Sequence, residues 1–161
     1  MIYLVSTRFT NKTWEENNAY RNKHGYTGCI YGSPQEMSPK ILIDADVLVV
    51  EMNNDKNAIE GIGLIKNRPI LDRYYKIYED YYYNRYTYKS DYRIDREVIL
   101  RMKPIIIDIL EKIVFKGKTH IKRGSGFTTI PEKLLKKSSE KNENINIVEE
   151  IKNIFICSFK I

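Results

Sequence analysis

Histidine, cysteine and tryptophan are scarce in this chain of 161 residues, which has two histidines, two cysteines and one tryptophan. Cys29 and Cys157 stand far apart, and neither lies in a metal-binding spacing with His24 or His120. We therefore expect no zinc site, no other metal and no cofactor. The cysteines are expected to be free thiols in a reducing intracellular compartment, the cytoplasm or nucleus, with one disulfide as the alternative.

Long apolar runs are also missing, since none approaches the roughly 20 residues of a membrane span. The first residues, MIYLVSTRFTNK, contain no basic region followed by a long apolar stretch, so we expect no signal peptide. The length and an apolar fraction of 42% instead predict a single soluble domain, residues 1–161, with a genuine core.

Acidic residues are absent from Lys112 to Arg123, although the chain as a whole has many charges. The formal net charge of +6 favours a polyanionic partner such as RNA or DNA. Five basic residues are concentrated in this acid-free stretch: Lys112, Lys116, Lys118, Lys122 and Arg123.

A β-hairpin is predicted at the centre of the chain. Asp46–Met52 is almost entirely apolar, as in a strand buried on both faces, and Ala58–Lys66 is a second aliphatic strand. The polar residues Asn53–Asn57 between them favour a turn. Gly61 and Gly63 point to the same side of the second strand, which indicates either barrel curvature or a ligand lying against the strand.

Helices are predicted on both sides of the hairpin. Asn11–Lys23 has Thr13 or Asn11 as candidate caps, and a helix that begins at Arg96 is kinked or divided by Pro104 before it ends at Gly117. Ile145–Ile161 is most simply a packed helix, with an edge strand over its last seven residues as the alternative.

Tyrosine is concentrated between Tyr74 and Tyr92, which hold nine of the thirteen tyrosines. We predict a strand over Tyr81–Lys89, because tyrosine favours strands and has an apolar ring with a polar tip. Its rings either cover a sheet or stack on nucleobases, with Arg85 and Arg93 meeting phosphate in the second case.

A second candidate site is the sequence GKTHIKRGSG. Gly124 and Gly126 free the backbone beside Lys122 and Arg123, so the segment either holds a phosphate or is a solvated surface loop. It lacks the order of a Walker motif and of a G-x-S-x-G elbow. His120 is a candidate base or stacking ring, but a structural role is the simpler interpretation.

The N-terminal strand, the first helix and the hairpin DVLVVEMNNDKNAIEGIGLI together resemble the PUA-like superfamily, most closely its EVE and YTH branches. The resemblance covers Ile2 to Arg68 best. It implies a compact α/β (α+β) fold, a mixed β pseudo-barrel flanked by helices. It also implies binding of RNA or DNA, in several members through an aromatic pocket for a modified base. The chain has only Trp14 and no equivalents of the YTH cage tryptophans, which leaves recognition of a modified base open.

The segments TRFTNKTWEENNAYR and GKTHIKRGSGFTTIP also resemble uncharacterised proteins of large DNA viruses, which implies location in a host cell or virion. Three functions follow from these observations. The first is a nucleic-acid-binding module, the second a self-associating packaging protein that forms a homodimer, and the third a small nucleic-acid-processing enzyme. The ASCH motif G-x-K-x-x-E-x-R is missing, and we assign no catalytic residue. The expected nucleic-acid-binding residues are Trp14, Tyr83, Arg85, Tyr86, Arg93, His120, Lys122, Arg123 and Ser125.

Overall fold

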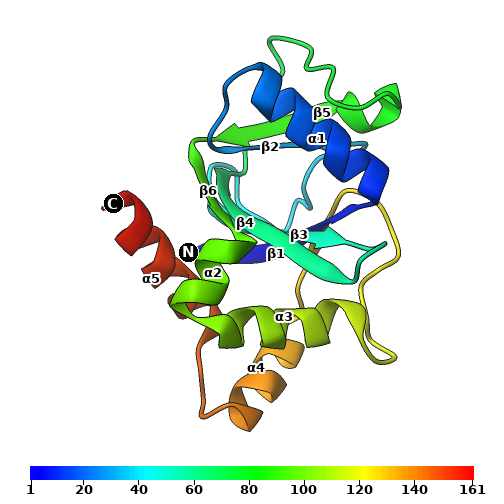
Figure 1. Ribbon diagram of the computed structural model, residues 1–161. Helices are drawn as coiled ribbons and strands as arrows, with labels where there is room; N and C mark the ends of the chain where they lie inside the picture. Colours follow the sequence, from blue (N-terminus) through cyan, green and yellow to red (C-terminus); the bar gives the residue numbers. More distant parts are fainter.

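The structure, a computed structural model, describes every residue from 1 to 161 and contains five α-helices, one short 3-10 helix and seven strands. Figure 1 shows them in chain order. The elements are β1 (Ile2–Phe9), α1 (Asn11–Lys23), β2 (Cys29–Ser33), β3 (Asp46–Asn53), β4 (Ala58–Lys66), η1 (Tyr81–Asn84), β5 (Tyr86–Ser90), β6 (Tyr92–Asp95), α2 (Arg96–Met102), α3 (Pro104–Phe115), β7 (Phe127–Thr129), α4 (Glu132–Lys141) and α5 (Ile147–Phe159).

Five strands form a mixed sheet in the order β6-β4-β3-β1-β7. The expected hairpin is confirmed at its centre, where β3 and β4 pair antiparallel along their whole lengths. Asn53 stabilises the turn, because its side-chain oxygen accepts hydrogen bonds from the N–H groups of Asp55 and Lys56. On the other side of β3 lies β1, which is parallel to it.

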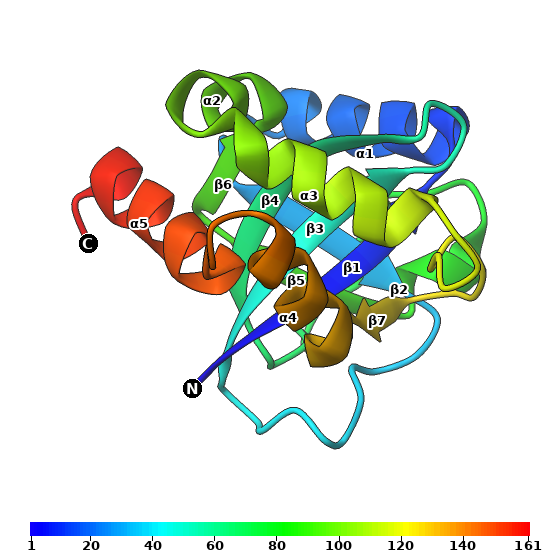
Figure 2. The same ribbon diagram turned by 90° about the horizontal axis from the view of Figure 1, so that it is seen from below.

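Both faces of this sheet are covered. On one face α3 and α5 pack against the aliphatic side chains of β3 and β4, as Figure 2 shows from below. On the other face lies the two-stranded sheet of β2 and β5, whose aromatic side chains Tyr31 and Tyr88 are buried with Val47 and Val49 of β3. Because β3 is buried on both faces, its sequence is continuously apolar from Val47 to Val50.

The mixed α/β (α+β) class predicted from the sequence is confirmed, but the sheets do not close into a barrel. The chain passes from the small sheet to the large one between β5 and β6, and Asp91 interrupts the strand there. β5 pairs with β2 and forms an isolated bridge from Thr87 to Ile70, whereas β6 pairs with β4. This bend at Asp91 is the physical reason why two separate sheets form.

The strand predicted over Tyr81–Lys89 is wrong in its first half, where η1 forms instead. The Asp80 side chain caps this turn by accepting a hydrogen bond from the Tyr82 N–H. Asn84 is buried, and its side-chain oxygen accepts hydrogen bonds from two N–H groups of the preceding loop. Local side-chain hydrogen bonds therefore override the strand preference of the tyrosines.

Two helices predicted from the sequence have the expected positions. α1 has the predicted bounds, but its cap is Thr10, which forms a reciprocal capping box with Thr13. The C-terminal segment is the helix α5, and the alternative edge strand over Phe155–Ile161 is wrong. Its packed apolar side chains follow helical spacing, as the sequence indicated.

The two cysteines are free thiols in the structure. Cys157 is exposed on α5, whereas Cys29 is buried between the small sheet and β4. Burial raises the pKa of Cys29 to about 12, so its thiol stays protonated at neutral pH.

Gly61 and Gly63 leave room for a buried ion pair rather than for a ligand. A Cβ atom at Gly61 would lie 2.6 Å from Arg93 Nη2 and 2.9 Å from Glu51 Oε1, and one at Gly63 would overlap the Tyr31 hydroxyl. These contacts leave no space on this face of β4 for the ligand that the sequence allowed. The paired glycines are instead required by the side chains of the protein itself.

The ion pair joins Glu51 on β3 to Arg93 on β6, with side chains 1% and 8% exposed. Arg93 Nη2 donates to Glu51 Oε1 at 2.7 Å and Arg93 Nε donates to Glu51 Oε2 at 3.0 Å. The Tyr31 hydroxyl also donates to Glu51 Oε2 at 2.6 Å. Burial alone would lower the pKa of Arg93, but the carboxylate of Glu51 outweighs burial and raises it, so the guanidinium remains charged.

We expect Gly63→Ala to destabilise the protein, because the added methyl group displaces the Tyr31 hydroxyl from Glu51. Overpacking of a well-packed core costs about 1–3 kcal/mol. The measurement is the free energy of unfolding in urea.

The matched background for this experiment is Tyr31→Phe, which removes the overlapping hydroxyl. Gly63→Ala should cost less in this background than in the wild type, since the closest contact is gone. Equal costs in the two backgrounds would show that the glycine does not serve the hydroxyl.

Candidate functional site

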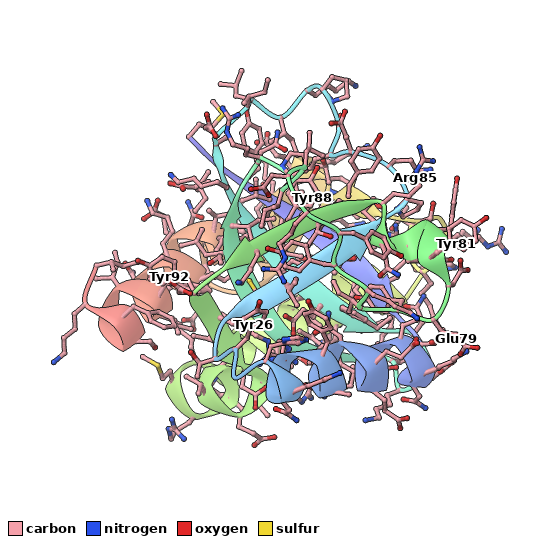
Figure 3. All side chains as sticks on the ribbon, turned by 90° about the horizontal axis from the view of Figure 1, so that it is seen from above. Tyr26, Glu79, Tyr81, Arg85, Tyr88 and Tyr92 are labelled. Atoms are coloured by element: carbon pink, nitrogen blue, oxygen red, sulfur yellow. The ribbon has the colours of Figure 1, made fainter.

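A cavity of about 380 Å³ opens where β1 ends and α1 begins. This volume falls within the roughly 300–1,000 Å³ of small-molecule sites. Its walls come from residues 7–10 and three residues of α1, from Gly32 of β2, from Asn54 in the hairpin turn, from Tyr78, Asp80 and Tyr83, and from Lys122 and residues 124–126 of the loop before β7. Figure 3 shows Glu79 and Tyr81 at this end of the molecule, beside the first turn of α1. Segments far apart in the sequence thus form one hollow.

Arg8 holds the loop 122–126, together with Ile121 at the start of the loop, against β1. Its guanidinium donates to the carbonyl oxygens of Gly124 at 3.2 Å, of Gly126 at 2.9 Å and of Ile121 at 3.4 Å, and to the Thr128 hydroxyl at 2.7 Å. No carboxylate forms an ion pair with Arg8, and burial lowers its pKa. A positive charge without a counter-ion therefore lies in the cavity wall.

The backbone N–H groups of the same loop are free. Three carbonyl groups turn inward to Arg8, whereas the N–H groups of residues 123–126 have no hydrogen-bond acceptor within the protein. Gly124 and Gly126 have φ angles of 101° and 70°, a left-handed conformation that favours glycine. Successive free N–H groups in such a loop form a concavity that binds anions.

Aromatic residues also line the cavity. Tyr83 is 37% exposed and meets the buried Tyr78 edge to face, with ring centroids 6.4 Å apart. The Tyr78 hydroxyl accepts a hydrogen bond from Asn17, and burial raises its pKa, so the phenol stays neutral. Phe9 completes this apolar wall and packs on Trp14 behind it.

The charged side chains of the cavity fall into two groups. Lys122 forms no ion pair and lies on the loop side, near Arg8. The second group comes from α1 and the segment before η1, where Glu16 accepts a hydrogen bond from the Glu79 N–H, Asp80 caps η1 and Lys12 pairs with Glu79. The cavity therefore combines cations without an ion pair, suited to an anion, with aromatic residues and acceptors suited to a flat polar group.

Several residues predicted for nucleic-acid binding come together here. Tyr83, Lys122 and Ser125 line the cavity, and Arg123 is exposed on the same loop. His120 precedes the loop, and its Nδ1 atom accepts a weak hydrogen bond of 3.4 Å from the Lys122 N–H. The polar contact of His120 is thus structural.

The other predicted residues lie elsewhere. Arg85 lies over the rings of Tyr82 and Tyr86, beside a separate shallow hollow. Trp14 is half-buried beneath the cavity wall, with the guanidinium groups of Arg21 and Arg93 about equally far from its ring, at 5.3 and 5.4 Å. Arg93 belongs to the buried ion pair. We therefore leave these residues out of the cavity site.

Arg8, Asn54 and Tyr78 line the cavity but were not predicted as site residues. Asn54 holds the loop from the hairpin side, because its amide group donates to the Lys122 carbonyl oxygen at 2.8 Å. Nothing in the sequence around Arg8 indicates its partners, which are more than 110 positions away. Only the pairing of β7 with β1 brings them together.

No three His, Cys, Asp or Glu side chains are grouped closely enough to hold a metal ion. None of the helices combines the length and the apolar character that a membrane span requires. Comparisons with protein-family models, with curated proteins and with solved structures found no match to this chain.

We expect Arg8→Gln to loosen the loop 122–126, because three loop carbonyl groups lose a charged donor. One hydrogen bond to a charged group contributes about 1.5–3 kcal/mol, so trypsin should cleave after Lys122 or Arg123 at least about tenfold faster. The measurement is limited proteolysis followed by mass spectrometry.

Arg101→Gln is the matched control, since Arg101 is exposed on α2 and forms no ion pair. It should leave the cleavage rate unchanged. Equal rates for Arg8→Gln and the wild type, at equal global stability, would contradict the assigned role of Arg8.

Proposed function

We propose that this protein binds single-stranded nucleic acid, with a phosphate on the loop 122–126 and the adjoining base in the cavity. The observation that carries the proposal is the junction of two complementary surfaces. The free N–H groups of residues 123–126 lie beside Lys122 and Arg123, and Tyr83 lines the same cavity.

The phosphate side supplies affinity without sequence preference. Lys122 forms no ion pair and Arg8 adds a positive charge behind the loop, so neither cation is already neutralised by a carboxylate. Binding of phosphates by cations releases counter-ions, and affinity therefore falls as the salt concentration rises.

The aromatic side supplies preference for unpaired bases. Stacking on an aromatic side chain contributes about 1–3 kcal/mol per base and requires a base that is free of its partner strand. Glu16 and Asp80 provide acceptors for the amino group of a base or for a ribose hydroxyl. The resemblance to the EVE and YTH branches adds a modified base as a candidate, here against Tyr78, Tyr83 and Phe9 rather than a tryptophan cage.

The experiment measures fluorescence anisotropy of labelled single-stranded RNA, single-stranded DNA and duplex DNA at several salt concentrations. Lys122→Gln with Arg123→Gln should weaken binding to every single strand and flatten the logarithmic salt dependence by about 1.4, or 0.7 per lost phosphate contact. Tyr83→Leu should lower affinity by about 1–3 kcal/mol and leave the salt dependence unchanged.

Two control variants match these changes. Lys23→Gln with Lys76→Gln removes the same charge from exposed lysines outside the cavity, and Tyr81→Leu removes a ring of η1 that lies outside it. The proposal is wrong if the wild type binds no oligonucleotide at low salt. It also fails if Tyr81→Leu and Tyr83→Leu have equal effects. The homodimer expected from the sequence stays a prediction.

A further inference from the structure

The positive charge of this protein comes from a single segment. Between Lys116 and Lys141 the chain has eight basic and two acidic residues, a surplus of six that equals the formal net charge of the whole protein. None of these ten side chains forms an ion pair, whereas ten ion pairs occur elsewhere. In the rest of the chain basic and acidic residues are equal in number, and many of them form these ion pairs. The segment can therefore attract a polyanion.

The segment is continuous in space from the cavity to α4. The loop leaves α3, reaches the cavity at Lys122 and continues as β7, which pairs with β1 at the edge of the sheet. Two residues separate the end of β7 from the start of α4, and α4 packs against α3. Figures 1 and 2 show this path along one side of the molecule. From Gly126 to Glu132 the extended chain spans at most about 20 Å.

The lysines of α4 face outward. Lys133, Lys136, Lys137 and Lys141 are exposed and recur at helical spacing, and the helix has two exposed acids, Glu132 and Glu140. Leu134 and Leu135 lie on the opposite side of the helix and pack against the main core. The basic face is therefore held in a fixed position by its own apolar face.

We infer that the exposed face of α4 binds the phosphate backbone of the same strand whose base occupies the cavity. This inference rests on the proposed function and specifies its ligand as a polynucleotide several residues long rather than a free nucleotide. The extended strand β7 lies between the loop and α4, and at about 3.3 Å per residue the four steps from Gly126 to Ile130 cover roughly 13 Å, more than the Debye length of about 8 Å at physiological salt. A short ligand in the cavity is thus screened from α4, and only a longer strand reaches both surfaces.

A basic amphipathic helix can also bind an anionic membrane, but it does so by inserting its apolar face. In α4 that face is already packed, because Leu134 and Leu135 contact the core of the protein. Nucleic acid is therefore the better partner, since it requires only the lysines.

The test compares two triple variants. The α4 variant carries Lys133→Gln, Lys136→Gln and Lys137→Gln, and the control carries Lys23→Gln, Lys40→Gln and Lys76→Gln. The control lysines are exposed, form no ion pair and remove the same total charge. The probes are single strands of about 4 and about 12 nucleotides, which span most of the site sizes of small single-strand-binding folds. Glutamine preserves helix propensity, so α4 should remain folded.

The α4 variant should lose about 10- to 100-fold in affinity for the longer strand at 0.1 M salt, and its salt dependence should fall by about 2, or 0.7 per lost contact. Its affinity for the shorter strand should stay within roughly twofold of the wild type, as should both affinities of the control.

Four results would overturn the inference. The first is an equal loss in the variant and the control, which indicates bulk charge. The second is an equal loss for both strand lengths. The third is unchanged binding of the longer strand together with lost binding to vesicles of anionic phospholipid. The fourth, no binding of either strand by the wild type, would refute the proposed function as well, whereas the first three leave that function standing.

Discussion

The buried ion pair between Glu51 and Arg93 is the constraint on which much of the architecture depends. Two charges removed from water are stable only when good geometry and further hydrogen bonds satisfy them. The bidentate contact, the Tyr31 hydroxyl and the Glu60 carbonyl oxygen supply these bonds. Arg93 crosses β4 beside Gly61 to reach β3, and the Tyr31 hydroxyl reaches the same carboxylate beside Gly63, which is why the intervening strand has glycine at two positions. The pair thereby joins the edge strand β6, the central strand β3 and the small sheet.

Sequence patterns predicted the elements whose side chains repeat with a regular period. The hairpin of β3 and β4, the bounds of α1 and the helix α5 all followed from such patterns. The segment before β5 did not, because a single buried side chain, Asn84, replaces the strand ladder with local hydrogen bonds. The glycines of β4 indicated that other groups lie close to the backbone of this strand. The sequence could not identify those groups, which are side chains of β2, β3 and β6.

Site residues could be predicted where they lie close together in the sequence, and could not be predicted where their contacts join distant segments. Lys122, Arg123, Ser125 and Tyr83 were recognised because cations beside glycines, and rings beside cations, are visible in short stretches. Arg8 was not, because an arginine in a strand gives no indication of the carbonyl groups that it will meet. The resemblance to the PUA-like superfamily stays a hypothesis, and the chemistry of the cavity stands independently of it.

The contacts of Arg8 also govern when the site can exist. Each loop carbonyl that it binds is more than 110 positions further along the chain, so the cavity depends on contacts of very high sequence separation. Such contacts form slowly, because a long loop must close before they provide any stabilisation. A nascent chain on the ribosome can pair β3 with β4 as soon as the hairpin has emerged. The loop 122–126 cannot reach Arg8 until β7 has been synthesised and has paired with β1. Synthesis thus separates folding of the hairpin from formation of the cavity.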